Sequence, residues 1–257
     1  MKYSTWLVVA SAMLNMAVAQ DTAEIRRLTD RQAVLLAKQD GDLNLDGLAD
    51  LSVKQAQILA THRGDLFLSG LSELSEQAAA ALARHQGDLY LIGVTALSDE
   101  AALALSNHRG GLWLDGLTEL SDAASEALAR HTDRLSLSGL TTVSDKSVQA
   151  LAAYNGRLAL DGLTSLSDEA AKALAEQPGD LSLSGISRLS DAAVESLARH
   201  KGYLGLGGLV TVTDAQADAI ASSKSQHIAL IGLVRLSDRG RLSLRSNPNV
   251  TLSDRFR

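Results

Sequence analysis

The chain has 257 residues, no cysteine and a formal net charge of −6 at pH 7. The absence of cysteine excludes disulfides and thiolate catalysis, and the acidic balance excludes a general nucleic-acid binder, whose affinity depends on neutralising phosphates. Hydrophobic residues make up 46% of the sequence but aromatic residues only 3%, so we expect a core of aliphatic side chains, chiefly Leu and Ala.

Residues 1–19 have the pattern of a secretory signal peptide. Lys2 supplies a positive N-terminal region, an apolar run covers 6–13, and Ala17 and Ala19 form a small-x-small cleavage pattern. The apolar run is much shorter than the roughly 20 residues that a membrane span needs. We therefore expect cleavage after Ala19, a secreted or periplasmic protein, and no membrane span in the mature chain.

Residues 20–40 show helical periodicity but no strand-like alternation. The triplet Leu-Thr-Asp at 28–30 matches the start of the helices expected later in the chain, and Ala33 and Leu36 have the spacing of a buried helical stripe. This segment predicts an N-terminal helical half-repeat, a cap that covers the first exposed face of the core.

Residues 41–247 contain nine copies of a 23-residue unit, and the clearest copy, at 64–86, reads GDLFLSGLSELSEQAAAALARHQ. When the unit is numbered 1 to 23, position 3 is Leu or Ile, position 5 is always Leu and position 7 is always Gly. A unit of this length that recurs along the whole chain predicts a solenoid, in which each copy packs against its two neighbours.

Within each copy the periodicity changes once, from that of a strand to that of a helix. Positions 2 to 6 alternate polar and apolar residues, which predicts a half-buried strand centred on positions 3 to 5. Gly at position 7 predicts a turn that a side chain would obstruct. Ser or Thr at position 12, usually followed by an acid, predicts the N-cap of a helix from about position 13 to 21. Gly at position 1, present in most copies, predicts a left-handed residue after the helix end.

One strand, one turn and one helix per copy predict a curved α/β solenoid, with a parallel β-sheet on the concave face and short α-helices on the convex face. The string LxLxGLxxLSDxAAxALA resembles leucine-rich repeats, most closely the ribonuclease-inhibitor-like and bacterial GALA-type variants. This resemblance implies a right-handed array that binds other macromolecules, usually proteins, and does not catalyse a reaction. The asparagine usual in such repeats is replaced by Leu71 and its equivalents, so other groups must bond the backbone in its place.

The C-terminal residues 248–257 predict a cap strand and a tail. Pro248 precedes a short strand expected at 250–252, and from Ser225 onward the chain has six Arg against two Asp. Proline and arginine at an open sheet edge discourage edge-to-edge association. A solvated cap and a site for an anionic ligand both fit this positive charge.

Histidine recurs at position 22, directly after the expected helix. The occupants of this position are His62, His85, His108, His131, Tyr154, Gln177, His200, Ser223 and Asn247. All can form hydrogen bonds but several are poor metal ligands, so we expect them to satisfy carbonyls at the helix ends and to bind no metal.

Motifs for cofactors and catalysis are incomplete or absent. Residues 42–47 match the first half of a calcium-binding loop, but Val53 stands where a bidentate Glu is required. The GxGxxG and GxSxG patterns of nucleotide-binding and hydrolase sites do not occur. We therefore expect no cofactor and no enzymatic activity.

Positions 2, 4 and 6 of each strand are expected to face the concave side, where packing does not dictate the residue. At position 4, three consecutive strands carry Phe67, Tyr90 and Trp113. Such a row can stiffen the sheet as a cross-strand ladder or form an interaction site, since clustered aromatics are typical of hot spots. We predict an interaction site, to which the neighbouring residues contribute: Ile92, Asp65, Asp88, Asp115 and Asn44.

Three functions are compatible with these features. The first is an exported, non-catalytic recognition protein that binds a protein partner through its concave face. The second is a carbohydrate-binding module, because aromatics beside carboxylates also suit sugar rings. The third is a purely structural envelope protein, in which the aromatic row is sheet packing. We favour the protein-binding function, with no nucleic acid as a partner.

Overall fold

The structure, a computed structural model, describes residues 22–256, and the predicted signal peptide lies outside them. Along this part of the chain, ten strands form one parallel sheet whose order follows the sequence. The strands are β1 (Leu43–Asn44), β2 (Leu66–Phe67), β3 (Leu89–Tyr90), β4 (Leu112–Trp113), β5 (Leu135–Ser136), β6 (Leu158–Ala159), β7 (Leu181–Ser182), β8 (Tyr203–Gly205), β9 (His227–Leu230) and β10 (Val250–Leu252).

One helix precedes the sheet and one separates each pair of successive strands. The helices are α2 (Asp30–Leu36), α3 (Val53–Leu59), α4 (Glu76–Leu82), α5 (Asp99–Leu105), α6 (Asp122–Leu128), α7 (Asp145–Ala152), α8 (Asp168–Ala175), α9 (Asp191–Leu197), α10 (Asp214–Ala221) and α11 (Asp238–Arg245). Two short 3₁₀ helices, η1 (Thr22–Glu24) and η2 (Asp254–Phe256), flank them. No helix within residues 22–256 is long and apolar enough to cross a membrane.

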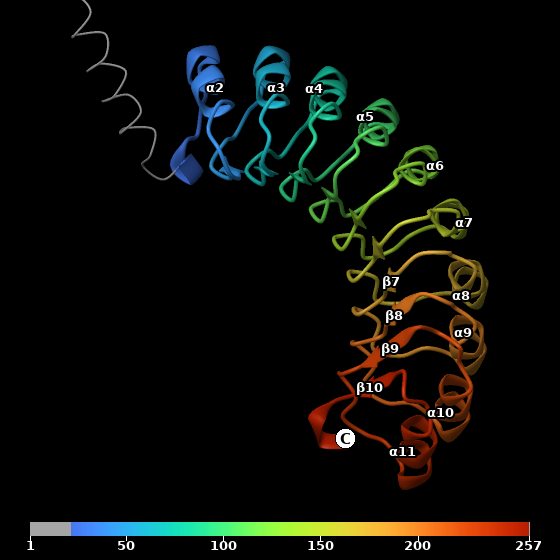
Figure 1. Cartoon of the computed structure of the whole chain (residues 1–257). Coiled ribbons are helices and arrows are strands. Elements are labelled where there is room, and N and C mark those ends of the chain that lie inside the picture. The colour runs from blue at the N-terminus through green and yellow to red at the C-terminus, as the bar shows by residue number, and fades with distance from the viewer. Residues whose placement is uncertain (1–21, 257) are drawn as a thin grey trace, which may run out of the picture.

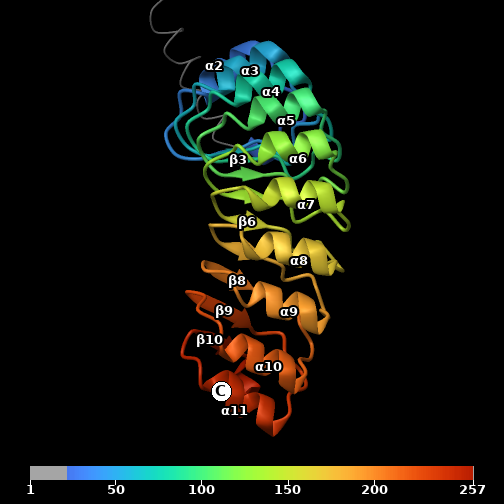
Figure 2. The same cartoon turned by 90° about the vertical axis from the view of Figure 1, so that its right-hand side faces the viewer.

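The repeats form an open arc, with the strands along its inner side and the helices along its outer side (Figure 1). In the view turned by 90°, the helices follow one another in a single column (Figure 2). Neighbouring strands pair with a register of one repeat, so that Leu66 lies beside Leu89 and Leu89 beside Leu112. The predicted α/β solenoid, with a concave parallel sheet and convex helices, is confirmed.

The strands and helices are shorter than the sequence predicted. β2 ends at position 4 of its repeat, although the amide of Leu68 at position 5 still donates to the carbonyl of Tyr90, at 2.8 Å. α4 ends at position 19, because Ala83 is already the C-cap and the amide of His85 bonds back to Leu82 in a turn. The chain must reverse twice within each repeat, and these turns shorten both elements.

The helix starts follow the prediction and also link the repeats. The hydroxyl of Ser121 accepts a hydrogen bond from the amide of Ala124, as an N-cap does, and donates to Asp99 in the first turn of the preceding helix, at 2.5 Å. The hydroxyl of Ser144 repeats this bond to Asp122 at 2.6 Å. The Ser-Asp pair therefore caps its own helix and ties it to the next.

Glycine at position 7 is required by the close approach of two backbones. A Cβ atom at Gly93 would lie 2.0 Å from the carbonyl oxygen of Ser69 in the preceding repeat. Glycine at position 1 is left-handed only in the first copy, at Gly41 with a φ of 84°, and the predicted role was wrong for the later copies that the structure describes. A Cβ atom at Gly110 would instead lie 2.3 Å from the carbonyl oxygen of Gly87. Both glycine positions therefore permit contact between repeats.

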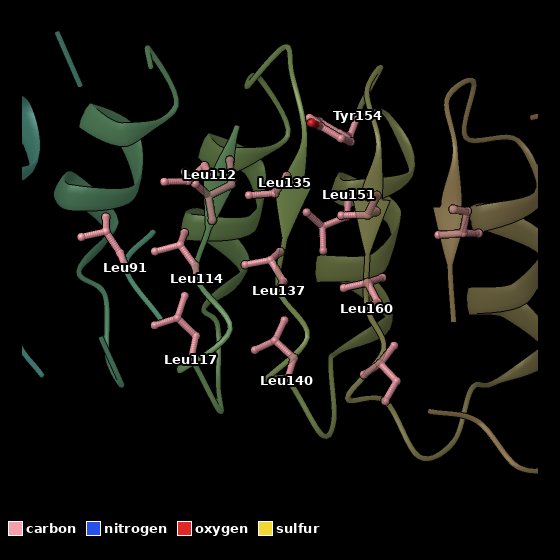
Figure 3. Packing of buried hydrophobic residues seen from close by; sticks show 14 of the residues in the cluster. Leu91, Leu112, Leu114, Leu117, Leu135, Leu137, Leu140, Leu151, Tyr154 and Leu160 are labelled. Atoms are coloured by element: carbon pink, nitrogen blue, oxygen red, sulfur yellow. The ribbon is translucent and has the colours of Figure 1, made fainter. Parts of the chain in front are cut away.

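The core consists of rows of leucine at positions 3, 5 and 8. Leu112, Leu114 and Leu117 in one repeat are fully buried, and their equivalents in the next repeat lie beside them (Figure 3). The leucine-rich repeats that the sequence resembles carry asparagine at position 8. In this chain the side chain at position 8 is apolar and belongs to the core. The sheet and the helices are thus joined by one continuous aliphatic layer.

The side chains at position 22 form a buried ladder between the repeats. The rings of His85 and His108 are parallel within 4°, with centroids 6.2 Å apart. Nε2 of His62 lies 2.8 Å from the carbonyl oxygen of Gly41, and the amide of Gln177 donates to the carbonyl of Tyr154, at 3.0 Å. His62 reaches the carbonyl of Gly41 at the start of its own repeat, whereas Gln177 reaches one at the end of the preceding repeat. At the same position Asn247 donates to the carbonyl of Ala221, the last residue of α10, at 3.2 Å, as expected of a group that satisfies a helix end. Within residues 22–256, no group of three or more His, Asp or Glu side chains is placed to hold a metal ion.

Burial lowers the pKa of four histidines of the ladder. For His108 the pKa falls to about 4, first because the ring has lost its water and then because His131 and His85 lie beside it. The pKa values of His85, His131 and His200 are lowered for the same principal reason. The folded array therefore holds these rings in their neutral form.

We predict that the solenoid loses stability as the pH falls below about 6.5, the pKa of a histidine in the unfolded chain. Between that pH and about 4, the unfolded chain binds a proton that His108 in the fold does not. Each such group lowers the free energy of unfolding by about 1.4 kcal/mol per pH unit. Urea unfolding at a series of pH values measures the slope, which should be shallower for His108→Gln, because Gln177 occupies the same position in its own repeat. Equal slopes for the two proteins would contradict this account.

We also predict that Gly93→Ala destabilises the fold by about 1–3 kcal/mol or more, because the added methyl group meets a backbone carbonyl that cannot move alone. The matched control is Gly207→Ala, whose Cβ would meet nothing closer than a side-chain atom of Ile231 at 3.3 Å. This control should change the stability by about 0.5 kcal/mol at most. Thermal melting of both variants is the measurement, and similar losses would show that the close approach is not limiting.

Candidate functional site

Three aromatic side chains stack on the concave face. Phe67, Tyr90 and Trp113 occupy matching positions on β2, β3 and β4. The ring centroids of Phe67 and Tyr90 lie 4.2 Å apart with an interplanar angle of 7°, and those of Tyr90 and Trp113 lie 4.2 Å apart at 15°. Strands about 4.8 Å apart bring residues in register to stacking distance. The structure thus unites the three predicted aromatics in one stack, half-buried by their mutual contact.

The stack ends on a guanidinium group. Cζ of Arg134, at position 2 of the next strand, lies 5.5 Å from the centroid of the Trp113 ring, within the range of a cation–π interaction. Gly111 makes room for the indole, because a Cβ atom there would lie 2.6 Å from Cζ3 of Trp113. The full stack therefore runs from Phe67 through Tyr90 and Trp113 to Arg134.

Tyr90 and Trp113 offer their edges, and not their faces, to a ligand. Both faces of Tyr90 are covered by Phe67 and Trp113, and the guanidinium of Arg134 lies over the Trp113 ring. A sugar ring bound by aromatic residues lies against a face, where its C–H groups meet the π electrons. The geometry of this stack therefore does not favour the carbohydrate-binding alternative.

The predicted acidic residues of the site also hold the backbone. Oδ1 of Asp65 accepts the amide of Asp88 at 2.9 Å, and Oδ1 of Asp88 accepts the amide of Gly111 at 2.7 Å. Oδ1 of Asp115 accepts the amide of Ser138 at 2.8 Å and the hydroxyl of Ser136 at 2.5 Å. Each carboxylate thus fastens its strand to the next one, and its Oδ2 accepts no hydrogen bond from residues 22–256.

The negative charges act on the middle ring of the stack. The pKa of Tyr90 is raised, first by its loss of solvent and then by the charges of Asp88 and Asp65. The phenol therefore remains a neutral hydroxyl at physiological pH, able to donate a hydrogen bond from the edge of the stack.

The other predicted site residues lie around the stack. Asn44, on β1, is exposed and its Oδ1 accepts the amide of Asp46 at 2.9 Å. Ile92 is 40% exposed and follows Tyr90 by two residues, as Asp115 follows Trp113. The structure thus places all eight predicted residues on or beside the first four strands, with the stacked rings as their common feature.

A hollow that the prediction did not include lies beyond the stack. At position 4 the side chains become small after Trp113, and a hollow of 360 Å³ lies over two of them, Ala159 and Ser182. A second hollow, of 420 Å³, adjoins it, and both are lined by Arg134, Arg157 and Asp180. Nε of Arg157 lies 3.1 Å from Oδ2 of Asp180, and Tyr203 lines the smaller hollow. The residues at position 2 carry the signal for it, since they change from Asp88 through glycine to two successive arginines.

Comparison with known proteins finds solved structures that are similar to this chain but no protein family that matches its sequence. No protein-family model and no curated protein matches the sequence. The chain is similar to a leucine-rich-repeat protein from Leptospira interrogans, at 17% identity over 93% of this chain and 80% of that one, with a TM-score of 0.45. It is also similar to an internalin from Listeria monocytogenes, at 15% identity over 82% and 75% of the two chains, with a TM-score of 0.36. What this chain binds therefore has to be inferred from its own concave face.

We predict that Gly111→Ala disturbs the stack without unfolding the array. The added methyl group would overlap the indole of Trp113, which must leave Tyr90 and Arg134. The loss of this aromatic contact should cost about 0.5–1.5 kcal/mol. In a Trp6→Phe background Trp113 is the sole tryptophan, so its fluorescence reports the displacement, and Gly207→Ala serves as the control. An emission spectrum identical to that of the parent protein would show that Gly111 does not position the ring.

Proposed function

We propose that this chain is an exported recognition protein of the leucine-rich-repeat type, which binds a protein partner through the N-terminal half of its concave face and catalyses no reaction. The observation that carries the proposal is the stack of Phe67, Tyr90 and Trp113 that ends on Arg134. Tryptophan, tyrosine and arginine are the residues most enriched in interaction hot spots.

The scaffold supports this use because stacking already holds the side chains in place. Rings that are fixed by their neighbours lose little conformational entropy when a partner binds, and such pre-organisation favours affinity. The sheet adds rigidity, since Asp65 and Asp88 fasten each strand to the next one. The concave face therefore presents a firm row of ring edges that is bordered by carboxylates.

The carboxylates suggest which charge the partner brings to this half of the face. Oδ1 of Asp65, Asp88 and Asp115 is used by the scaffold, but each group keeps its negative charge and a second oxygen. A basic side chain of the partner beside these residues would make binding weaken with rising salt concentration, whereas a neutral glycan would bind with little dependence on salt. The salt dependence therefore separates the protein-binding function from the carbohydrate alternative.

Export is the part of the proposal that rests on the sequence alone. Residues 1–19 have a positive start, an apolar run and a small-x-small motif. A secreted or periplasmic location would place the concave face in contact with extracytoplasmic proteins. N-terminal sequencing of the protein recovered from an exporting cell tests the expected cleavage after Ala19.

We predict that Trp113→Ala lowers the affinity for the partner by more than about 2 kcal/mol, as for the central residue of a hot spot. Its effect on stability should be limited to the lost stacking, about 0.5–1.5 kcal/mol. The partner is to be captured on the immobilised wild-type chain, identified and purified. Calorimetric titration of wild type and variant then gives the affinities, and thermal melting gives the stabilities.

Leu114→Ala is the matched control, because it changes the adjacent residue, which is fully buried in the core. It should destabilise the array by about 2–5 kcal/mol through the cavity that it leaves. If Trp113→Ala melts as badly as Leu114→Ala while it keeps the affinity for the partner, the stack serves the scaffold and the proposed function is wrong.

A further inference from the structure

The hollow beyond the aromatic stack has the shape of a pocket for a side chain. Its floor is formed by short residues, Ala159 and Ser182, while Arg134 and Arg157 line one side and Tyr203 lies on the next strand but one from Arg157. The smaller of the two adjoining hollows measures 360 Å³, enough for one or two amino-acid side chains. The two arginines directly precede the neighbouring strands β5 and β6, whose residues Leu135 and Leu158 are paired.

Arg134 and Arg157 both have guanidinium N–H groups that are not hydrogen-bonded within residues 22–256. Arg134 forms no ion pair with residues 22–256, and its guanidinium forms no hydrogen bond with them. The guanidinium lies over the ring of Trp113. Arg157 is paired with Asp180 through Nε, but a guanidinium has five N–H donors and one carboxylate uses at most two of them. An acceptor that enters the hollow therefore meets two guanidinium groups.

Each carboxylate around the hollow has at least one oxygen hydrogen-bonded to the backbone. Oδ1 of Asp88 accepts the amide of Gly111 at 2.7 Å, and Oδ1 of Asp133 accepts the amide of Arg134 at 2.8 Å. Oδ1 of Asp180 accepts the amide of Tyr203 at 3.1 Å while its Oδ2 faces Arg157. Of these groups only Asp180 lines the smaller hollow, together with both arginines, and within residues 22–256 none of them forms an ion pair with Arg134.

We propose that this pocket receives an acidic side chain of the protein partner, whose carboxylate binds between Arg134 and Arg157. The methylene groups of a glutamate would lie on the apolar floor at Ala159, beside the ring of Tyr203. This inference rests on the proposed function and adds a preference for a partner with an acidic side chain. The partner carries a carboxylate that enters the pocket while its neighbouring residues meet the edges of the aromatic stack.

The position of Arg134 links the two parts of the surface. Its guanidinium is held over Trp113, so the last member of the stack is also the first wall of the pocket. A guanidinium that lies over an aromatic ring still has N–H groups in its own plane, and these can donate to a carboxylate. Glutamine, which has the same shape as glutamate but no charge, should bind this pocket more weakly.

The test uses the full chain in a Trp6→Phe background, so that Trp113 alone reports fluorescence. The probes are the blocked peptides acetyl-Ala-Glu-Leu-amide and acetyl-Ala-Gln-Leu-amide, titrated to millimolar concentrations and followed by fluorescence and by calorimetry. We expect the glutamate peptide to bind at least about tenfold more tightly than the glutamine peptide, a difference of about 1.4 kcal/mol. The difference should shrink as the salt concentration rises.

Arg134→Gln and Arg157→Gln should each reduce the preference for glutamate, and calorimetry is the deciding readout because Arg134→Gln also changes the surroundings of Trp113. Arg188→Gln is the control, an exposed arginine that does not line the hollow. The assignment of the pocket is overturned if the glutamate peptide does not bind, if the two peptides bind equally, or if both arginine variants keep the preference.

The outcomes separate this inference from the proposed function. Capture of a partner that depends on Trp113 but is unaffected by Arg134→Gln and Arg157→Gln would leave the protein-binding function standing and overturn the acidic pocket. A glutamate preference that depends on both arginines, together with partner binding that ignores Trp113→Ala, would support the pocket and overturn the proposed role of the stack.

Discussion

Close contact between the backbones of successive repeats is the constraint on which the rest of the structure depends. At position 7 a Cβ atom on Gly70 would lie 2.2 Å from a carbonyl oxygen of the preceding repeat, and at position 1 a Cβ atom on Gly64 would lie 2.0 Å from another. Only hydrogen fits at such distances. The glycines, at position 7 of every copy and at position 1 of most copies, let the repeats stack closely enough for the strands to pair and for the leucine rows to close the core.

The same stacking aligns every other row of side chains. Position 22 becomes a ladder of parallel rings such as His85 and His108, and position 12 becomes a series of caps such as Ser144, which bonds to the preceding helix. Position 4 becomes the aromatic stack, because the register of the strands places Tyr90 between Phe67 and Trp113. The aromatic stack on the concave face and the buried ladder thus arise from the same stacking of repeats.

The last repeat shows how the array tolerates a departure from that rule. Ser225 is an inserted residue, and its hydroxyl donates to the carbonyl of His200 at 2.5 Å while its amide bonds to Oγ of Ser223, at 3.1 Å. The strand after it, β9, has four residues and still pairs in register with β8 and β10. A hydroxyl placed at the insertion therefore supplies the bonds that a regular repeat obtains from position 22.

The sequence by itself determined the solenoid, the parallel order of the strands and the starts of the helices, because each is repeated with the period of the unit. Asp122 after Ser121 predicts a helix start wherever that pair recurs, because the N-cap bond joins residues only three apart in the chain. The row of Phe67, Tyr90 and Trp113 could be predicted in the same way, as residues one repeat apart.

Only the tertiary structure decided the contacts between side chains that occupy different positions of the repeat. Arg134 and Trp113 differ in their position within the repeat, and their contact depends on Gly111 leaving room for the indole. The aspartates that the sequence predicted as binding groups, such as Asp88, were found to hold amides as well. A repeat pattern specifies which residues are stacked. Contacts between different positions of successive repeats, and the hollow over the small side chains, depend instead on how the larger side chains fill the curved face.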